Sequence, residues 1–194
     1  MFGKLDSWSV CAAVLLVLST VGFAATASYG AGEASAASCG AGGPSTFFTL
    51  SGQVQNPKVY DLAALEKFHP KTAVQEVCTS GKGMQGPAEY EGVLLWDLLT
   101  EAVLIKDPNV KNDSGEMFVL VTGTDCYQQL FSIAELSPTL GGSSQVTVAY
   151  KVNGALLPSS DGFVRLIPPG DKGGDRTIYN VMSIQVFNGR HLPQ

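Results

Sequence analysis

The sequence is short of basic residues and of histidine. It has 12 Lys and Arg against 17 Asp and Glu, which gives a formal net charge of −5 over 194 residues. Nucleic-acid-binding domains present a basic face, and anionic membrane surfaces attract clusters of Lys and Arg. This charge balance therefore argues against both as partners. The two histidines, His69 and His191, lie in no recognisable metal-binding or catalytic motif, and we expect both to be solvated.

A hydrophobic run long enough to span a membrane is also missing. Spanning takes about 20 consecutive apolar residues, whereas the unbroken apolar run covers only residues 10–18. The run follows a single lysine and precedes Ala25-Thr26-Ala27, which has the form of a cleavage site. This arrangement predicts a Sec-type signal peptide over residues 1–27. We expect a periplasmic or secreted protein with no membrane span after cleavage.

The remaining chain has one predicted domain. Gly, Ala and Ser dominate residues 28–45, which predicts a flexible leader without a core of its own. Residues 46–188 carry the apolar patterns and are long enough for one hydrophobic core. Residues 189–194 form a short C-terminal tail.

Cysteine is scarce and odd in number after processing, with Cys39, Cys78 and Cys126. Export implies an oxidising compartment in which paired thiols persist. An odd count leaves at least one cysteine unpaired or otherwise engaged. We expect no lipid anchor at Cys39, because it lies far behind the apolar run and has Ala36 where a Leu-like residue is typical. For Cys78, a metal ligand, half of a disulfide and a small buried residue all stay open.

Short alternating segments fill the domain and predict strands. Asp61 and Ser132 are predicted helix N-caps, and Glu135 completes a capping box with Ser132. Asn153-Gly154 predicts a hairpin turn. The predicted strands are 46–54, 72–78, 117–123, 127–132, two that flank the hairpin turn, one before Pro168, and 176–187 with a bulge; the predicted helices are 60–68, 92–103 and 132–136, and a glycine-rich loop runs from residue 79 to 92. The sum is an α+β fold with a mixed, largely antiparallel sheet.

The order of these segments carries a family resemblance. The chain reads FTLSGQVQNPKVYDLAALEKF, a strand that ends in Cys78, YEGVLLWDLLTEAV, VTGTDCY, VTVAYKVNGALLP and DGFVRLIPPG. This series, over about residues 47–187, resembles the molybdopterin-binding domain of the sulfite oxidase family. The resemblance implies that fold, a molybdenum-molybdopterin cofactor, and transfer of an oxygen atom and electrons on a small substrate.

The resemblance also implies site residues. Cys78 falls where the family supplies a thiolate to molybdenum, and soft sulfur suits such a metal. Asp125 matches an aspartate that contacts the cofactor, and Arg165 matches an arginine that holds the anionic pterin. A planar guanidinium suits a bidentate contact of that kind. We therefore expect Arg165 in a cleft that Asp125 and Cys78 also line.

Several positions depart from the family pattern. Asp161 replaces a histidine before the arginine, and Tyr179 stands near the place of a lysine, for which Arg176 and Lys172 are candidate replacements. Cys126 stands where glycine is usual, and we expect its sulfur near that of Cys78.

The signal peptide also departs from what the cofactor requires, because carriers of this cytoplasmically assembled group leave folded, through a twin-arginine signal that is absent here. Two functions stay open. One is an exported molybdopterin-binding oxidoreductase, with a redox partner protein. The other is a cofactor-free descendant that binds a ligand or a partner protein.

Overall fold

The computed structural model describes residues 40, 42–79 and 83–191, and within this part the side chains of residues 77–79 and of Gly83 are not described. The predicted signal peptide, most of the leader and Cys39 lie outside the described residues. In the described part, no helix is long and apolar enough to cross a membrane.

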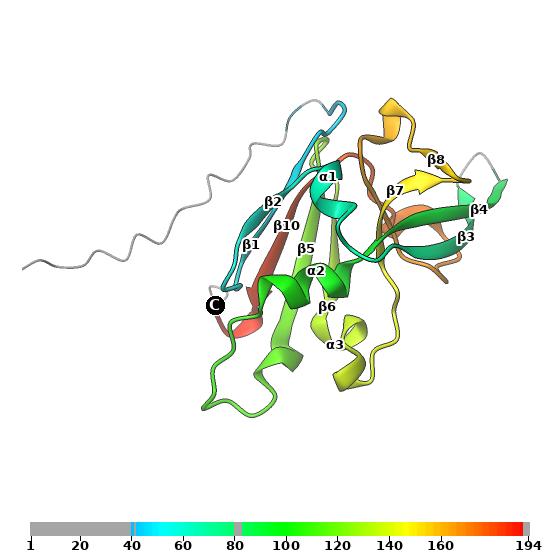
Figure 1. The fold of residues 1–194 in the computed structure, drawn as a ribbon. Coiled ribbons are helices and arrows are strands. Elements are labelled where there is room, and N and C mark those ends of the chain that lie inside the picture. Colours follow the sequence, from blue (N-terminus) through cyan, green and yellow to red (C-terminus); the bar gives the residue numbers. More distant parts are fainter. Residues whose placement is uncertain (1–39, 41, 80–82, 192–194) are drawn as a thin grey trace, which may run out of the picture. The chain divides into compact units, whose positions relative to one another are not determined.

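The first sheet has five strands in the order β2-β1-β10-β5-β6. Their bounds are β1 Phe48–Gly52, β2 Lys58–Tyr60, β5 Met117–Gly123, β6 Gln128–Ser132 and β10 Val181–Asn188. Strands β1 and β10 pair in parallel, and the other neighbours pair antiparallel. The last strand of the domain thus lies at the centre of this sheet (Figure 1).

The second sheet is built on a long hairpin. Strand β3, Lys71–Thr79, pairs antiparallel with β4, Gly83–Leu94, and β4 pairs with β7, Thr147–Val152. Strands β8, Ala155–Leu156, and β9, Arg165–Ile167, both pair with β7. β3 is therefore a terminal strand of this sheet.

Short helices connect the strands. They are α1 Leu62–Leu65, α2 Leu95–Ala102 and α3 Ile133–Leu136, with 3-10 turns η1 Asp113–Glu116, η2 Pro138–Leu140, η3 Ser159–Asp161, η4 Gly174–Arg176 and η5 Gly189–His191. Asp61 caps α1 by accepting from the Ala64 N–H, and Ser132 with Glu135 forms a capping box on α3. These contacts satisfy N–H groups that have no partner inside the helix.

One apolar core joins the two sheets and α2. Leu95, Leu98 and Leu99 of α2 are fully buried against Phe48 and Val186 of the first sheet and residues of β4, β7 and β9 in the same cluster. The i, i+3, i+4 spacing of these leucines puts them on one face of the helix. A second, smaller cluster lies on the other face of the second sheet and contains Ala73, Tyr90, Ala149 and Ile167.

The α+β prediction with a largely antiparallel arrangement is confirmed, as are both caps and the Asn153-Gly154 turn, whose two residues have φ of 49° and 80°. The bulge in the last strand is found between Val181 and Ser183. The predicted loop from residue 79 to 92 is wrong, because residues 83–94 form β4, and α2 consequently begins at Leu95 rather than at residue 92. The last strand begins at Val181, not at residue 176.

Candidate functional site

The outer face of the second sheet carries Arg165. In β9, Leu166 belongs to the main core, while Arg165 and Ile167 alternate onto the other face. Leu166 exchanges two backbone hydrogen bonds with Ile178, at 2.8 and 3.2 Å. This pairing sets Thr177 and Tyr179 beside β9, on the same face as Arg165.

The guanidinium of Arg165 is enclosed by its neighbours. Its Nη1 donates to the Tyr90 hydroxyl at 3.0 Å and lies 3.5 Å from Asp161 Oδ2. The guanidinium carbon lies 4.0 Å from the centroid of the Tyr179 ring and 5.3 Å from that of Tyr90. Only 12% of the Arg165 side chain is exposed. Burial raises the pKa of the Tyr90 phenol, and the positive charge of Arg165 opposes that rise. The phenol therefore stays neutral and can donate or accept a hydrogen bond.

Two buried polar atoms on this face have no hydrogen-bond partner in the described part of the chain. They are Arg165 Nε and Thr177 Oγ1. Buried polar groups in folded proteins are nearly always hydrogen-bonded, so such atoms mark places where a function or an adjustment of structure is expected. Both belong to the segment that the family resemblance assigns to the pterin.

Asp125 lies in the turn that follows β5. Its Oδ1 accepts from the Tyr127 N–H at 3.0 Å. The neighbouring Thr124 N–H donates to the Asn180 carbonyl at 3.0 Å, and the Asn180 N–H donates to the Asp161 carbonyl at 2.8 Å. The turn therefore reaches the Arg165 neighbourhood through Asn180, and the structure gives no direct contact between Asp125 and Arg165.

Cys126 has a left-handed backbone with φ of 69° and is disulfide-bonded. A positive φ favours glycine, which explains why glycine is usual at this place in the family pattern. The side chain of the disulfide partner is not among those described.

Arg176 pairs with two carboxylates. Its Nε and Nη2 donate to the two oxygens of Asp171 at 2.8 and 2.9 Å, and its Nη1 donates to Glu135 Oε1 at 2.9 Å. These contacts raise the pKa of Arg176, with the Asp171 hydrogen bonds as the largest cause. The guanidinium also lies 5.0 Å from the Phe131 ring centroid. Arg176 therefore ties the loop after β9 to α3.

The backbone of Cys78 pairs with that of Met84 at the end of the hairpin where β3 leads into β4, but the side chain of Cys78 lies outside the described set. The predicted convergence of Cys78 with Asp125 and Arg165, and its predicted proximity to Cys126, therefore stay predictions. Among the described residues, no group of three or more His, Cys, Asp and Glu could hold a metal ion.

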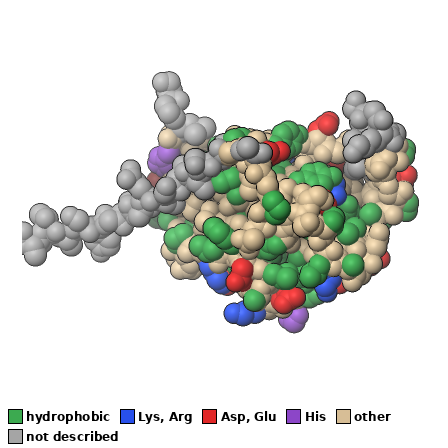
Figure 2. Space-filling view, turned by 90° about the horizontal axis from the view of Figure 1, so that it is seen from above, with side chains coloured by type: hydrophobic (Ala, Val, Ile, Leu, Met, Phe, Trp, Pro, Cys, Tyr) green, Lys and Arg blue, Asp and Glu red, His purple; other side chains and the backbone are tan. Residues whose placement is uncertain are grey.

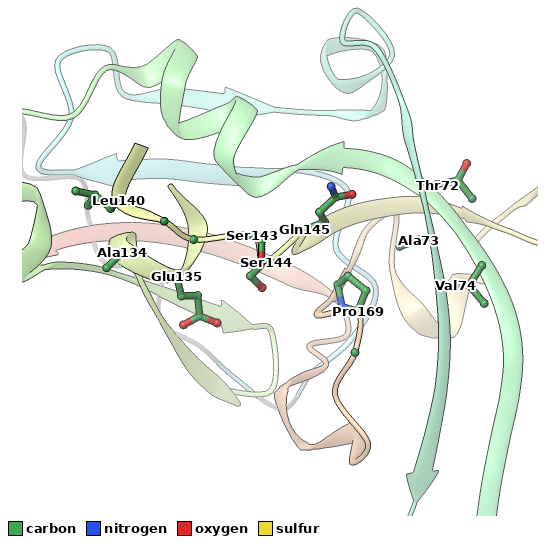
Figure 3. Close-up of a pocket in the computed structure, with 13 residues that line it drawn as sticks. Thr72, Ala73, Val74, Ala134, Glu135, Leu140, Ser143, Ser144, Gln145 and Pro169 are labelled. Atoms are coloured by element: carbon green, nitrogen blue, oxygen red, sulfur yellow. The ribbon is translucent and has the colours of Figure 1, made fainter. Parts of the chain in front are cut away.

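Two cavities lie in other places. An open groove of about 760 Å³ runs between β3 and the segments 140–145 and 169–170 (Figure 3). A smaller pocket of about 310 Å³ is lined mainly by apolar side chains such as Leu62, Leu157 and Phe163. Figure 2 shows hydrophobic side chains scattered over one face, with acidic and basic side chains close together along an edge. No single-sign charged patch marks the part of that face that the structure describes.

The sequence reasoning missed Tyr90 and Thr177. Tyr90 was placed in a predicted loop, and its role depends on the unexpected strand β4. Thr177 has no pattern that distinguishes it from an ordinary strand residue.

Comparisons with known proteins decide the family. No curated protein matches the chain. The model of the oxidoreductase molybdopterin binding domain family matches residues 45–190, which is most of the chain. The chain belongs to this family.

A solved structure supports the fold of this molybdopterin-binding-domain protein. The chain is similar to the sulfane dehydrogenase SoxCD from Paracoccus pantotrophus, with 23% identity and a TM-score of 0.53. The match covers 73% of this chain and 38% of the SoxCD chain, so the protein spans well under half the length of that relative. The likeness concerns the fold.

The family implies a molybdenum-pterin cofactor, which is anionic, so its site needs positive charge that is free to bind it. The two arginines that the resemblance assigns to it face three carboxylates: Asp161 beside Arg165, and Asp171 and Glu135 beside Arg176. Tyr90 and Tyr179 also cover the guanidinium of Arg165. In this arrangement these two arginines do not fit the group.

Proposed function

We propose that this protein is an exported binding module that uses the molybdopterin-binding fold without the cofactor. The observation that carries the proposal is the enclosure of Arg165 by Asp161, Tyr90 and Tyr179. A buried guanidinium with a carboxylate and an aromatic face already beside it gains little from a second anion. Arg165 then stabilises the domain, and binding takes place elsewhere on its surface.

The predicted export route agrees with this function. A chain that crosses the membrane unfolded, behind a signal without the twin-arginine pair, leaves a cytoplasmically assembled cofactor behind. The predicted signal peptide and periplasmic or secreted location are part of the proposal.

A molybdopterin-dependent oxidoreductase is the second candidate, with a small-molecule substrate and a redox partner protein. It is favoured by the family membership and by the place of Cys78 at the end of β3, where the family supplies its thiolate. Arg165 Nε and Thr177 Oγ1, which have no hydrogen-bond partner among the described residues, are further donors on the outer face of the second sheet.

Metal and pterin analysis separates the two functions. The exported chain is purified from its native envelope after growth with added molybdate, beside a Cys78→Ser variant. The binding module predicts far less than one molybdenum per chain in both proteins. One molybdenum and one pterin per wild-type chain, lost in Cys78→Ser, would establish the oxidoreductase and overturn the proposal.

A further inference from the structure

The outer edge of β3 presents unpaired backbone groups. β3 pairs with β4 on one side and is the terminal strand of its sheet. The N–H and C=O of a strand residue point to the same side of the strand, and the sides alternate along the chain. The hydrogen bonds of β4 therefore show which residues of β3 face outward.

The backbone N–H and C=O groups of Glu89 in β4 point away from β3. Its carbonyl accepts from the Asn153 N–H at 2.7 Å and its N–H donates to Asn153 Oδ1 at 3.0 Å. The backbone groups of Tyr90 and Ala88, on either side of Glu89, consequently point toward β3, where their register partners are Ala73 and Gln75. The N–H and C=O groups of Thr72 and Val74 then point outward from the sheet.

These outward groups meet the groove of about 760 Å³. Thr72, Ala73 and Val74 line one wall, and Gly141, Ser144 and Pro169 are among the residues of the other walls. Figure 3 shows the side chains of Thr72 and Val74 pointing away from Ser144 and Pro169. The groove thus meets the strand through its backbone and the small Ala73 side chain, and no other backbone hydrogen bond is found at Thr72 or Val74 within the described residues.

Residues Thr72 to Gln75 on this edge lack the usual protection against pairing with another strand. Natural edge strands are blocked by charged residues, prolines, bulges or short length. β3 has nine residues, and the four that follow Lys71, Thr72 to Gln75, are uncharged. The bulge between Gln75 and Val77 begins only beyond this window.

We propose that an extended peptide segment of a partner protein binds in this groove as an added strand on β3. Two donor–acceptor pairs two residues apart, about 6.8 Å along a strand, match the repeat of an extended backbone. Glu135, the charged side chain of the lining, is already paired with Arg176, and the chain has a net charge of −5, so a neutral or basic peptide fits better than an acidic one. This inference deepens the proposed binding function and rests on it for the biological role.

The test starts from a phage-displayed library of random linear heptapeptides, selected on the exported chain. An enriched peptide is synthesised, and its affinity is measured by fluorescence polarisation. Val74→Pro removes one outward N–H without removing a β3–β4 hydrogen bond. We expect it to weaken binding about tenfold, the cost of one to two hydrogen bonds.

Leu156→Pro is the matched control. Leu156 is 56% exposed against 60% for Val74, and its N–H also points outward, because the next residue, Leu157, donates to Tyr150. Peptide binding to Leu156→Pro should equal that to wild type. Methylation of alternate peptide nitrogens tests the same contacts on the wild-type protein, so the proposal is testable even if Val74→Pro fails to fold.

Several results would overturn the proposal. The first is that the selection enriches no peptide. The second is that neither Val74→Pro nor methylation of the peptide backbone weakens peptide binding. The third is that the bound peptide does not protect the Thr72 and Val74 amides from hydrogen exchange. A dimer seen by light scattering and lost in Val74→Pro would assign the edge to a second copy instead. Molybdenum analysis is independent of all these results, so a failure of the proposed function is distinguishable from a failure of the peptide site.

Discussion

The two faces of the second sheet differ in what they bury. The inner face contributes Val93, Val148 and Leu166 to a core of apolar residues with almost no exposure. The outer face buries Gln75, Arg165 and Thr177 among small and aromatic residues, and two of its polar atoms have no partner in the described structure.

This difference means that the fold and the proposed function depend on different faces of the second sheet. An apolar face tolerates exchanges between hydrophobic residues of similar volume. A buried polar face depends on particular partners, and here Asp161 and Tyr179 supply them where the family pattern has a histidine and a lysine. The inner face therefore holds the two sheets of the fold together, and the proposed function places the difference from the family pattern on the outer face.

The largest loss of stability is expected from a substitution in the core against which the inner face packs. Leu98 of α2 is fully buried between the two sheets. Leu98→Ala leaves a cavity and should lower the free energy of unfolding by about 2–5 kcal/mol. Urea denaturation followed by circular dichroism measures this loss. Leu156→Ala, at an exposed position, should change stability by no more than about 0.5 kcal/mol; an equal loss in both variants would contradict the account of the core.

The disulfide of Cys126 comes next. Gly40, the neighbour of Cys39 in sequence, donates to the Thr124 carbonyl at 3.1 Å, whereas Cys78 lies on a strand of the other sheet. We expect peptide mapping without reductant to join Cys126 to Cys39 and to find Cys78 as a free thiol. Cys126→Ser should cost about 2–4 kcal/mol of stability. A Cys78–Cys126 peptide would restore the pairing considered from the sequence and would exclude a metal thiolate at Cys78.

The inner face could be predicted from sequence, and the outer face could not. Leucine spacing in α2, the Ser132–Glu135 box and Asn153-Gly154 are local patterns with local physical causes. β4 was missed because Gly83, Gly86 and Pro87 are typical of a loop, and the strand depends on pairing with β3 and β7 on both sides. The identities of Arg165 and Asp125 came from the resemblance alone. The enclosure of Arg165 could not be predicted, since it depends on Tyr90, which lies 75 positions away in the chain.

Arg165→Met tests the outer face directly. If Arg165 stabilises the domain, its loss leaves the partly buried Asp161 carboxylate and the Tyr90 hydroxyl without this partner. The free energy of unfolding should then fall by about 1–3 kcal/mol. The double variant Arg165→Met with Asp161→Asn should recover part of this loss, because the unpaired charge is removed. Unchanged stability of the single variant would instead favour an arginine held ready for an anionic ligand.

The smallest effect concerns a buried polar group that, unlike those of the outer face, is fully partnered. Asp113, at the end of the first sheet, accepts from the Asp107 N–H at 3.0 Å and from Asn188 Nδ2 at 2.9 Å, and these contacts lower its pKa. A lowered pKa in the folded state means that the unfolded chain binds the proton more readily. The stabilisation is therefore complete above the ordinary aspartate pKa of about 3.9 and is lost as the pH falls through the lower folded value.

Urea denaturation at a series of pH values between about 6 and 2 measures this dependence. Asp113→Asn should flatten the acid part of the stability curve, and Asn188→Ala should shift it in the same direction by removing one donor. An unchanged acid slope in Asp113→Asn would show that other carboxylates determine acid stability. The contrast between a satisfied polar group beside the core and the unsatisfied groups of the outer face would then have no energetic consequence at this end of the sheet.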